Sequence, residues 1–173
     1  MLGRSRHLLI PLLIGLPLLS CRDSYADTPD RQGLLLIGGG LFDLIRTSDT
    51  PLFTLEYRYR PSIRFNPHVS LSHLIGAMVT SSPSGYFCGG MAFDFSFGRR
   101  IFLSPSFAPG IYVRGKGKDL GFPIAFRSAI RFSYRFSSGI GLGAMFYHIS
   151  NASLGYTNPG AECLIFFVSI PIN

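Results

Sequence analysis

Three residues near the end of the chain have the types and spacing of a serine hydrolase triad. His148 and Ser150 are two positions apart, so on a β-strand both side chains leave the same face. Glu162 follows beyond a stretch rich in Asn, Gly and Pro, which is typical of a loop. Such triads are defined by geometry rather than by chain order. The set offers a nucleophile, Ser150, a general base, His148, and a group that could orient the imidazole, Glu162, although most His-x-Ser pairs are ordinary surface residues.

The sequence around these residues resembles the His-x-Ser-Asn … Glu signature of the outer-membrane lipid A 3-O-deacylases (PagL) and their acyloxyacyl-hydrolase relatives. The two most specific segments, 148–152 and 158–162, read HISNA and NPGAE. The resemblance covers most of the chain after residue 33. It extends back through segments 40–43, 56–58, 117–121 and 126–128.

This resemblance implies an esterase that removes the acyl chain at position 3 of lipid A, without metal or cofactor. Lipopolysaccharide would be the substrate, and a 3-hydroxyacyl chain would be released. By the same resemblance, the side-chain amide of Asn151 is predicted to stabilise the charge on the attacked carbonyl oxygen. Ser153 stands where this family often has Gly, which weakens the case for a backbone contribution to that oxyanion hole.

The composition limits the class of protein. The 173 residues correspond to one domain, with few charged residues, 14% aromatic residues and a positive mean hydropathy. No apolar run after residue 20 is long enough for a membrane-spanning helix, which leaves a soluble β-sandwich or a membrane β-barrel. The net charge of +7 comes largely from arginines scattered at strand spacing, so we predict a lipid partner and no nucleic acid.

Residues 1–26 have the features of an export signal, and residues 27–173 those of the exported domain. Two arginines precede an apolar run, and Ser24-Tyr-Ala26 is a small-x-small cleavage site. Cys21 offers an alternative, because Leu-Leu-Ser-Cys is also typical of a lipoprotein site; both processing routes stay open. His68 and His73 are isolated, so we predict no metal site.

Eight segments of alternating polarity predict an all-β fold, and alternation alone fits a soluble sandwich as well as a barrel. The export signal, the number of segments and the aromatic content favour an eight-stranded antiparallel transmembrane β-barrel in the outer membrane. Closure leaves no unpaired edge, as a bilayer requires. Glu56 and Asp94 lie on the charged face and are expected to pair inside the barrel with Arg58, Arg127, Arg131 and Arg135. The predicted strands cover residues 33–45, 51–60, 68–79, 85–97, 100–114, 121–136, 139–150 and 162–172.

The same alternation puts the triad on the lipid-facing side. His148 and Ser150 share a face with Leu142 and Phe146, and Glu162 shares one with Leu164 and Phe166; these four apolar residues are predicted to hold the acyl chain. If the amino terminus is periplasmic, the site lies at the outer leaflet. Lys116 and Lys118 are then on the same rim, where they could attract lipid A phosphates or form a merely solvated loop.

Cys88 and Cys163 fall on opposite sides of such a barrel, too far apart for a disulfide, so both are predicted to be free thiols. Two other functions remain open. One is a non-enzymatic barrel, an adhesin or structural protein of the outer membrane, and the other is a phospholipase with the same triad.

Overall fold

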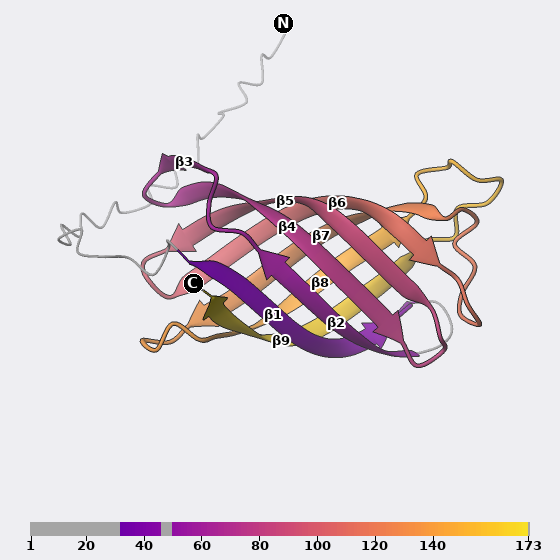
Figure 1. Cartoon of the computed structure of the whole chain (residues 1–173), viewed down its shortest axis with the longest axis horizontal. Helices are drawn as coiled ribbons and strands as arrows, with labels where there is room; N and C mark the ends of the chain where they lie inside the picture. Colours follow the sequence, from indigo (N-terminus) through magenta and orange to yellow (C-terminus); the bar gives the residue numbers. More distant parts are fainter. Residues whose placement is uncertain (1–31, 46–49, 173) are drawn as a thin grey trace, which may run out of the picture.

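The computed structural model describes residues 32–45 and 50–172, which form a closed antiparallel β-barrel (Figure 1). The barrel closes because β1 pairs with both β2 and β9, while β2 pairs with β4. The predicted eight-stranded barrel is confirmed, with strand ends within a few residues of the expected ones. Its wall consists of β1 (Gly33–Phe42), β2 (Thr50–Arg58), β4 (Val69–Thr80), β5 (Gly85–Phe97), β6 (Ile101–Val113), β7 (Ile124–Arg135), β8 (Gly141–Ser150) and β9 (Ala161–Ile172).

A short additional strand, β3 (Ile63–Asn66), pairs only with β4 and lies at one end of the barrel. The sequence analysis treated this segment as a connection. Pro61 and Pro67 bracket only five residues, and this is too few for alternating polarity to reveal a strand. All four residues of β3 are exposed.

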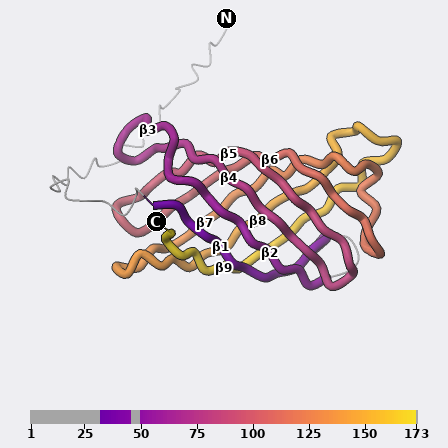
Figure 2. The backbone as a smooth tube through the Cα atoms, in the orientation of Figure 1, coloured from indigo at the N-terminus to yellow at the C-terminus, as the bar shows by residue number. Residues whose placement is uncertain are grey.

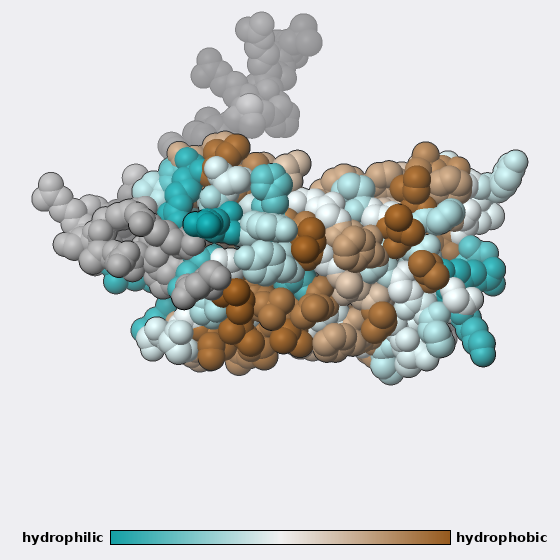
Figure 3. All heavy atoms as spheres, viewed as in Figure 1, coloured by the Kyte–Doolittle hydropathy of each residue, from teal (hydrophilic) through white to brown (hydrophobic). Residues whose placement is uncertain are grey.

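The alternation of side chains follows the prediction along the whole wall. Inward positions of β2 and β7 bury Glu56, Arg58, Arg127 and Arg131, while outward positions such as Phe53 are exposed. In Figure 3 apolar side chains spread over the barrel wall, and the most hydrophilic ones gather toward the two ends. An apolar outer wall around a polar interior is the pattern of a transmembrane β-barrel.

The barrel interior contains a network of buried ion pairs. Glu56 accepts hydrogen bonds from Arg58 (2.8 Å) and Arg127 (2.5 Å). Asp94 accepts from Arg58 (3.2 Å) and Arg131 (3.0 Å). The expected pairing of both carboxylates with interior arginines is therefore confirmed for Arg58, Arg127 and Arg131, and the guanidinium of Arg135 also lies over the ring of Phe102.

The two ends of the barrel differ. The described chain enters at β1 and leaves at β9 at one end, where β3 also lies. β1 ends and β2 begins at the other end, which also carries the connections after β4, β6 and β8 (Figure 2). Cys88 and Cys163 are both buried and free. The described residues include no helix long and apolar enough to cross a membrane. The predicted export signal over residues 1–26, and with it Cys21, lies outside the described residues.

Candidate active site

The register between β8 and β9 brings two of the predicted triad residues together. His148 is the direct cross-strand partner of Glu162. Its Nδ1 lies 3.1 Å from Oε1 of the carboxylate, and 44% of the His148 side chain is exposed, against 17% of the Glu162 side chain. Because Nδ1 faces the carboxylate, Nε2 is the ring nitrogen left to exchange a proton with a nucleophile.

Ser150 lies on the same outward face of β8, at the last position of the strand. Two residues of a strand span about 7 Å between Cα atoms, so the hydroxyl reaches the imidazole only by leaning along the strand. Within the described part of the chain, the Ser150 side chain forms no hydrogen bond. The structure thus places the predicted nucleophile beside the base, without the hydrogen bond that would join them.

A second serine flanks the imidazole from the other side. Ser128 on β7 is the direct cross-strand partner of His148, and its side chain is exposed on the same outward face. Side chains of directly opposite residues have Cβ atoms about 5 Å apart. Ser128 is not among the predicted site residues, because its proximity to His148 depends on the β7–β8 register.

Gly160 packs against the imidazole. It has a positive φ of 62°, and a Cβ added there would lie 2.6 Å from Cε1 and 3.2 Å from Nε2 of His148. A residue with a side chain cannot occupy this position without moving the ring. Gly160 belongs to the Asn-, Gly- and Pro-rich stretch that predicts a loop, and the structure adds a direct contact of this glycine with the predicted base.

Asn151 is fully buried and organises the loop that follows β8. Its Nδ2 donates to the carbonyl oxygens of Leu120 and Thr157, both at 2.7 Å, and its backbone N–H donates to Oδ1 of Asn158 at 3.0 Å. Both side-chain hydrogens are therefore engaged within the protein. The oxyanion role of Asn151 stays a prediction, and donation from its amide to a substrate oxygen requires one of these bonds to open.

A tight turn follows Asn151 directly. Leu154 donates its backbone N–H to the Asn151 carbonyl at 3.0 Å, and the two residues between them, Ala152 and Ser153, have φ values of 50° and 63°. Positive φ is uncommon outside glycine, and such strain is found mainly at functional sites. Over the residues that the structure describes, the backbone N–H groups of Ala152 and Ser153 have no acceptor, so both remain available to a ligand.

We expect Ser153→Gly to raise the free energy of unfolding by about 0.5–1 kcal/mol, because glycine adopts a positive φ without the steric cost that serine carries there. The measurement is the urea midpoint of the refolded protein in detergent, followed by circular dichroism. Ser153→Ala is the control, since it removes the hydroxyl but keeps the strained φ, and it should unfold as the wild type does. An equal gain in both variants would assign the effect to the hydroxyl instead.

The apolar residues predicted to hold an acyl chain form outward strips beside the site. Leu142 and Phe146 on β8 are 48% and 40% exposed, and Phe166 on β9 is 66% exposed, while Leu164 is half-buried. The β8–β9 register pairs Phe146 with Leu164 and places Phe166 opposite Ala144. The strips therefore continue from the site along the barrel wall.

A polar pocket of about 300 Å³ opens at the same end of the barrel. Lys118 lies in its wall and is tied to Asp43 by an ion pair of 2.5 Å, so the predicted attraction of phosphates by Lys118 is opposed by a neighbouring carboxylate. Lys116 also lines the pocket. Leu44, next to Asp43, donates its backbone N–H to the carbonyl of Glu162 at 3.0 Å, which connects this rim to the candidate active site.

The donor set of the site is that of an acid–base pair rather than of a metal centre. Glu162 faces one imidazole, and no cluster of three or more His, Cys, Asp or Glu residues that could bind a metal ion occurs within residues 32–45 and 50–172.

The closed barrel with its apolar outer wall belongs to the class of outer-membrane β-barrels, and the His–Glu pair beside a serine on that wall is an arrangement used by hydrolases. The family model described as lipid A 3-O-deacylase (PagL) matches residues 53–171. This chain is a member of that family. The predicted family resemblance and the outer-membrane location are thereby confirmed.

The comparison with solved structures agrees on the fold. The crystal structure of the outer membrane enzyme PagL has a TM-score of 0.66 and 18% sequence identity, and the match covers 80% of this chain and 99% of that one. Two designed transmembrane β-barrels match at a TM-score of 0.54 with 11% and 13% identity, covering 82% of this chain and 96% and 94% of theirs. No curated protein sequence matches the chain.

Proposed function

We propose that this protein hydrolyses the acyl ester at position 3 of lipid A, with Ser150, His148 and Glu162 as its catalytic triad. The observation that carries this proposal is the His148–Glu162 contact on the outward wall of the barrel. A charged group facing lipid costs roughly 2–4 kcal/mol at the bilayer midplane and much less near the interface. Polar groups clustered at a strand end on this wall are better explained by chemistry than by packing.

In the proposed reaction, Oγ of Ser150 attacks the ester carbonyl carbon and gives its proton to Nε2 of His148. The carbonyl oxygen becomes an oxyanion, and the ester bond to the sugar then breaks. The leaving sugar oxygen takes the proton back from the imidazolium. A water molecule, deprotonated by the same nitrogen, cleaves the acyl-enzyme and releases the 3-hydroxy fatty acid. Glu162 stabilises the imidazolium in both halves of the reaction.

The turn after β8 is suited to stabilise the oxyanion. Ala152 and Ser153 have unengaged backbone N–H groups, and they follow the nucleophile within three residues. Preorganised N–H donors of this kind typically contribute about 10²–10³ in turnover each. In this proposal Asn151 contributes by fixing the loop, through its bonds to Leu120 and Thr157, as well as by the predicted direct donation.

The proposal places the site at the outer leaflet, where lipid A resides. With a periplasmic amino terminus, β8 ends and β9 begins at the cell surface. The acyl chain of the substrate would lie along the strips of Leu142, Phe146, Leu164 and Phe166. Lys116 is the side chain that we propose to attract a lipid A phosphate at the rim.

The test is mass spectrometry of lipid A from a lipopolysaccharide-producing host that expresses this protein, with the empty vector as control. We expect lipid A that has lost the mass of one 3-hydroxyacyl chain, and the released 3-hydroxy fatty acid in the same culture. Unmodified lipid A, with the folded protein present in the outer membrane, would contradict the proposal. Purified protein on phospholipid vesicles without lipopolysaccharide then distinguishes a phospholipase, which releases fatty acid, from a non-enzymatic barrel, which does not.

A further inference from the structure

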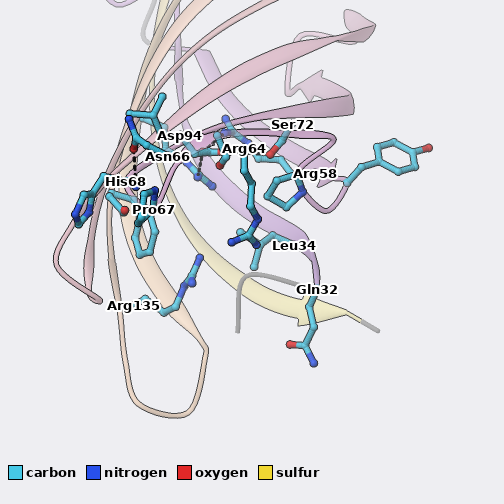
Figure 4. A pocket seen from close by; sticks show the side chains of 17 residues that line it. Gln32, Leu34, Arg58, Arg64, Asn66, Pro67, His68, Ser72, Asp94 and Arg135 are labelled. Carbon is cyan, nitrogen blue, oxygen red and sulfur yellow. Dashed lines mark hydrogen bonds and ion pairs between the residues drawn. The ribbon is translucent and has the colours of Figure 1, made fainter. Parts of the chain in front are cut away.

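A second polar cavity lies inside the barrel at the end opposite the candidate active site. Its volume is about 40 Å³, and β3 and the segment leading to β4 form part of its wall. In Figure 4 the side chains of Arg58, Ser72 and Asp94 lie on one side of this cavity, and those of Gln32 and Arg135 lie on the opposite side. The proposed esterase reaction uses none of these residues.

The buried network next to this cavity carries an excess of positive charge. Among the residues that the structure describes, it contains three guanidinium groups, of Arg58, Arg127 and Arg131, and two carboxylates, of Glu56 and Asp94. The three arginine side chains are each at most 4% exposed. Burying a charge without a counter-charge is unfavourable, so a further anion close to these groups would stabilise the network.

Hydrogen bonding leads to the same conclusion. Nη2 of Arg58 and Nε of Arg131 are buried and have no acceptor in the described structure, and both residues line the cavity. The oxygens of Asp94 are already shared: Oδ1 accepts from Arg58, Ser104 and Arg131, and Oδ2 accepts from Ser72. A ligand that supplies acceptor oxygens to the two orphan donors would complete the network.

We propose that this cavity binds one small inorganic oxyanion of the phosphate or sulfate class. Guanidinium groups match the geometry of such oxyanions and form charge-assisted hydrogen bonds with them. A volume of 40 Å³ admits about three water molecules, which is also the room that one tetrahedral oxyanion requires. Arg64 and Arg135 also line the cavity.

The first experiment is a titration of the refolded mature protein in detergent with inorganic phosphate, sulfate or chloride. Ionic strength is held constant with an organic sulfonate too large for the cavity. Calorimetry is expected to show one phosphate site per barrel with a Kd on the order of 1 mM or tighter. At a hundredfold excess over Kd, phosphate should raise the Tm by about 5 °C or more. Sulfate should act similarly, and chloride should have a smaller effect.

Two serine variants localise the site. Ser96→Asp adds a carboxylate to the cavity wall, two positions after Asp94 on β5, and so supplies the missing negative charge covalently. Its Tm without phosphate should exceed that of the wild type, and phosphate should no longer raise it. Ser138→Asp adds the same charge to an exposed turn that does not line the cavity, and it should respond to phosphate as the wild type does.

Three results would overturn the proposal. The first is the absence of both binding heat and a Tm shift with phosphate in the wild type. The second is a chloride effect as large as that of phosphate, which would reject the oxyanion class. The third is a phosphate response of Ser96→Asp equal to that of the wild type, which would place binding elsewhere. If Ser96→Asp does not fold, the calorimetric titration of the wild type decides alone.

Discussion

Alanine in place of Ser150 is expected to lower the rate of 3-hydroxy fatty acid release from lipid A by about 10⁴-fold or more, while the barrel still folds. Removing the nucleophile leaves the His148–Glu162 pair without a hydroxyl to activate, and the residues of a triad act as one unit. Ser150 is the last residue of β8 and forms no side-chain hydrogen bond with any described residue, so its loss should not alter stability. The measurement is fatty acid release by purified protein from lipid A in detergent micelles.

Ser128→Ala is the matched control for this experiment. Both serines are on the outward face beside His148, one along the same strand and one across the β7–β8 pair. The Ser128→Ala variant should keep at least about half of the wild-type rate. Activity is assigned to the hydroxyl of Ser150, because Ser150 precedes the turn with free backbone N–H groups and Ser128 does not. The reverse pattern, with Ser150→Ala active and Ser128→Ala inactive, would move the nucleophile to β7.

The barrel itself could be predicted because the alternation of side chains along a strand remains recognisable even when the predicted ends of that strand are wrong by a few residues. Along each wall strand exposed outward residues alternate with buried inward ones, and where the inward residues are polar or small, as in β7, a period of two identifies both the strand and its inner face. In β7 the inward Arg127 and Arg131 are buried and the outward Ile130 and Phe132 are exposed, as expected. β3 was missed because a strand of four residues is too short for this pattern.

The individual partners of interior side chains could be predicted only in part. Alternation showed that Glu56 and Asp94 face arginines, but not which arginine each one meets, because this depends on the registers between β2, β4, β5, β6 and β7. The excess guanidinium next to the cavity became visible only when these contacts were known. The same holds for Lys118, whose pairing with Asp43 joins residues far apart in the sequence.

The candidate active site likewise combines contacts that residue type and spacing predict with contacts that depend on the register between strands. His148 and Glu162 could be selected as partners from residue type and spacing, and the register places them opposite each other. Ser128 could not be selected, since a serine on an outward strip has no distinctive spacing. The bonds of Asn151 to Leu120 and Thr157 depend on two loops meeting, and loop conformations follow no sequence period.

Gly160→Ala is expected to reduce deacylation by about 10²-fold or more, although it changes none of the triad residues. The new methyl group would lie 2.6 Å from Cε1 of His148, so either the imidazole or the backbone of the loop must move. A displacement of about 1 Å in a catalytic group is sufficient for a loss of this size. The loss should fall mainly on kcat, because the strips on β8 and β9 that are proposed to hold the acyl chain are unchanged.

Gly98→Ala separates this effect from backbone strain. Gly98 has a φ of 66°, close to the 62° of Gly160, but a Cβ added there meets nothing within 4 Å. Both variants therefore carry the same cost of a positive φ, on the order of 1 kcal/mol in the free energy of unfolding. Only Gly160→Ala should lose activity when both are assayed on lipid A after their urea midpoints are compared. Equal activity in the two variants would show that the imidazole tolerates the methyl group and that Gly160 serves the turn alone.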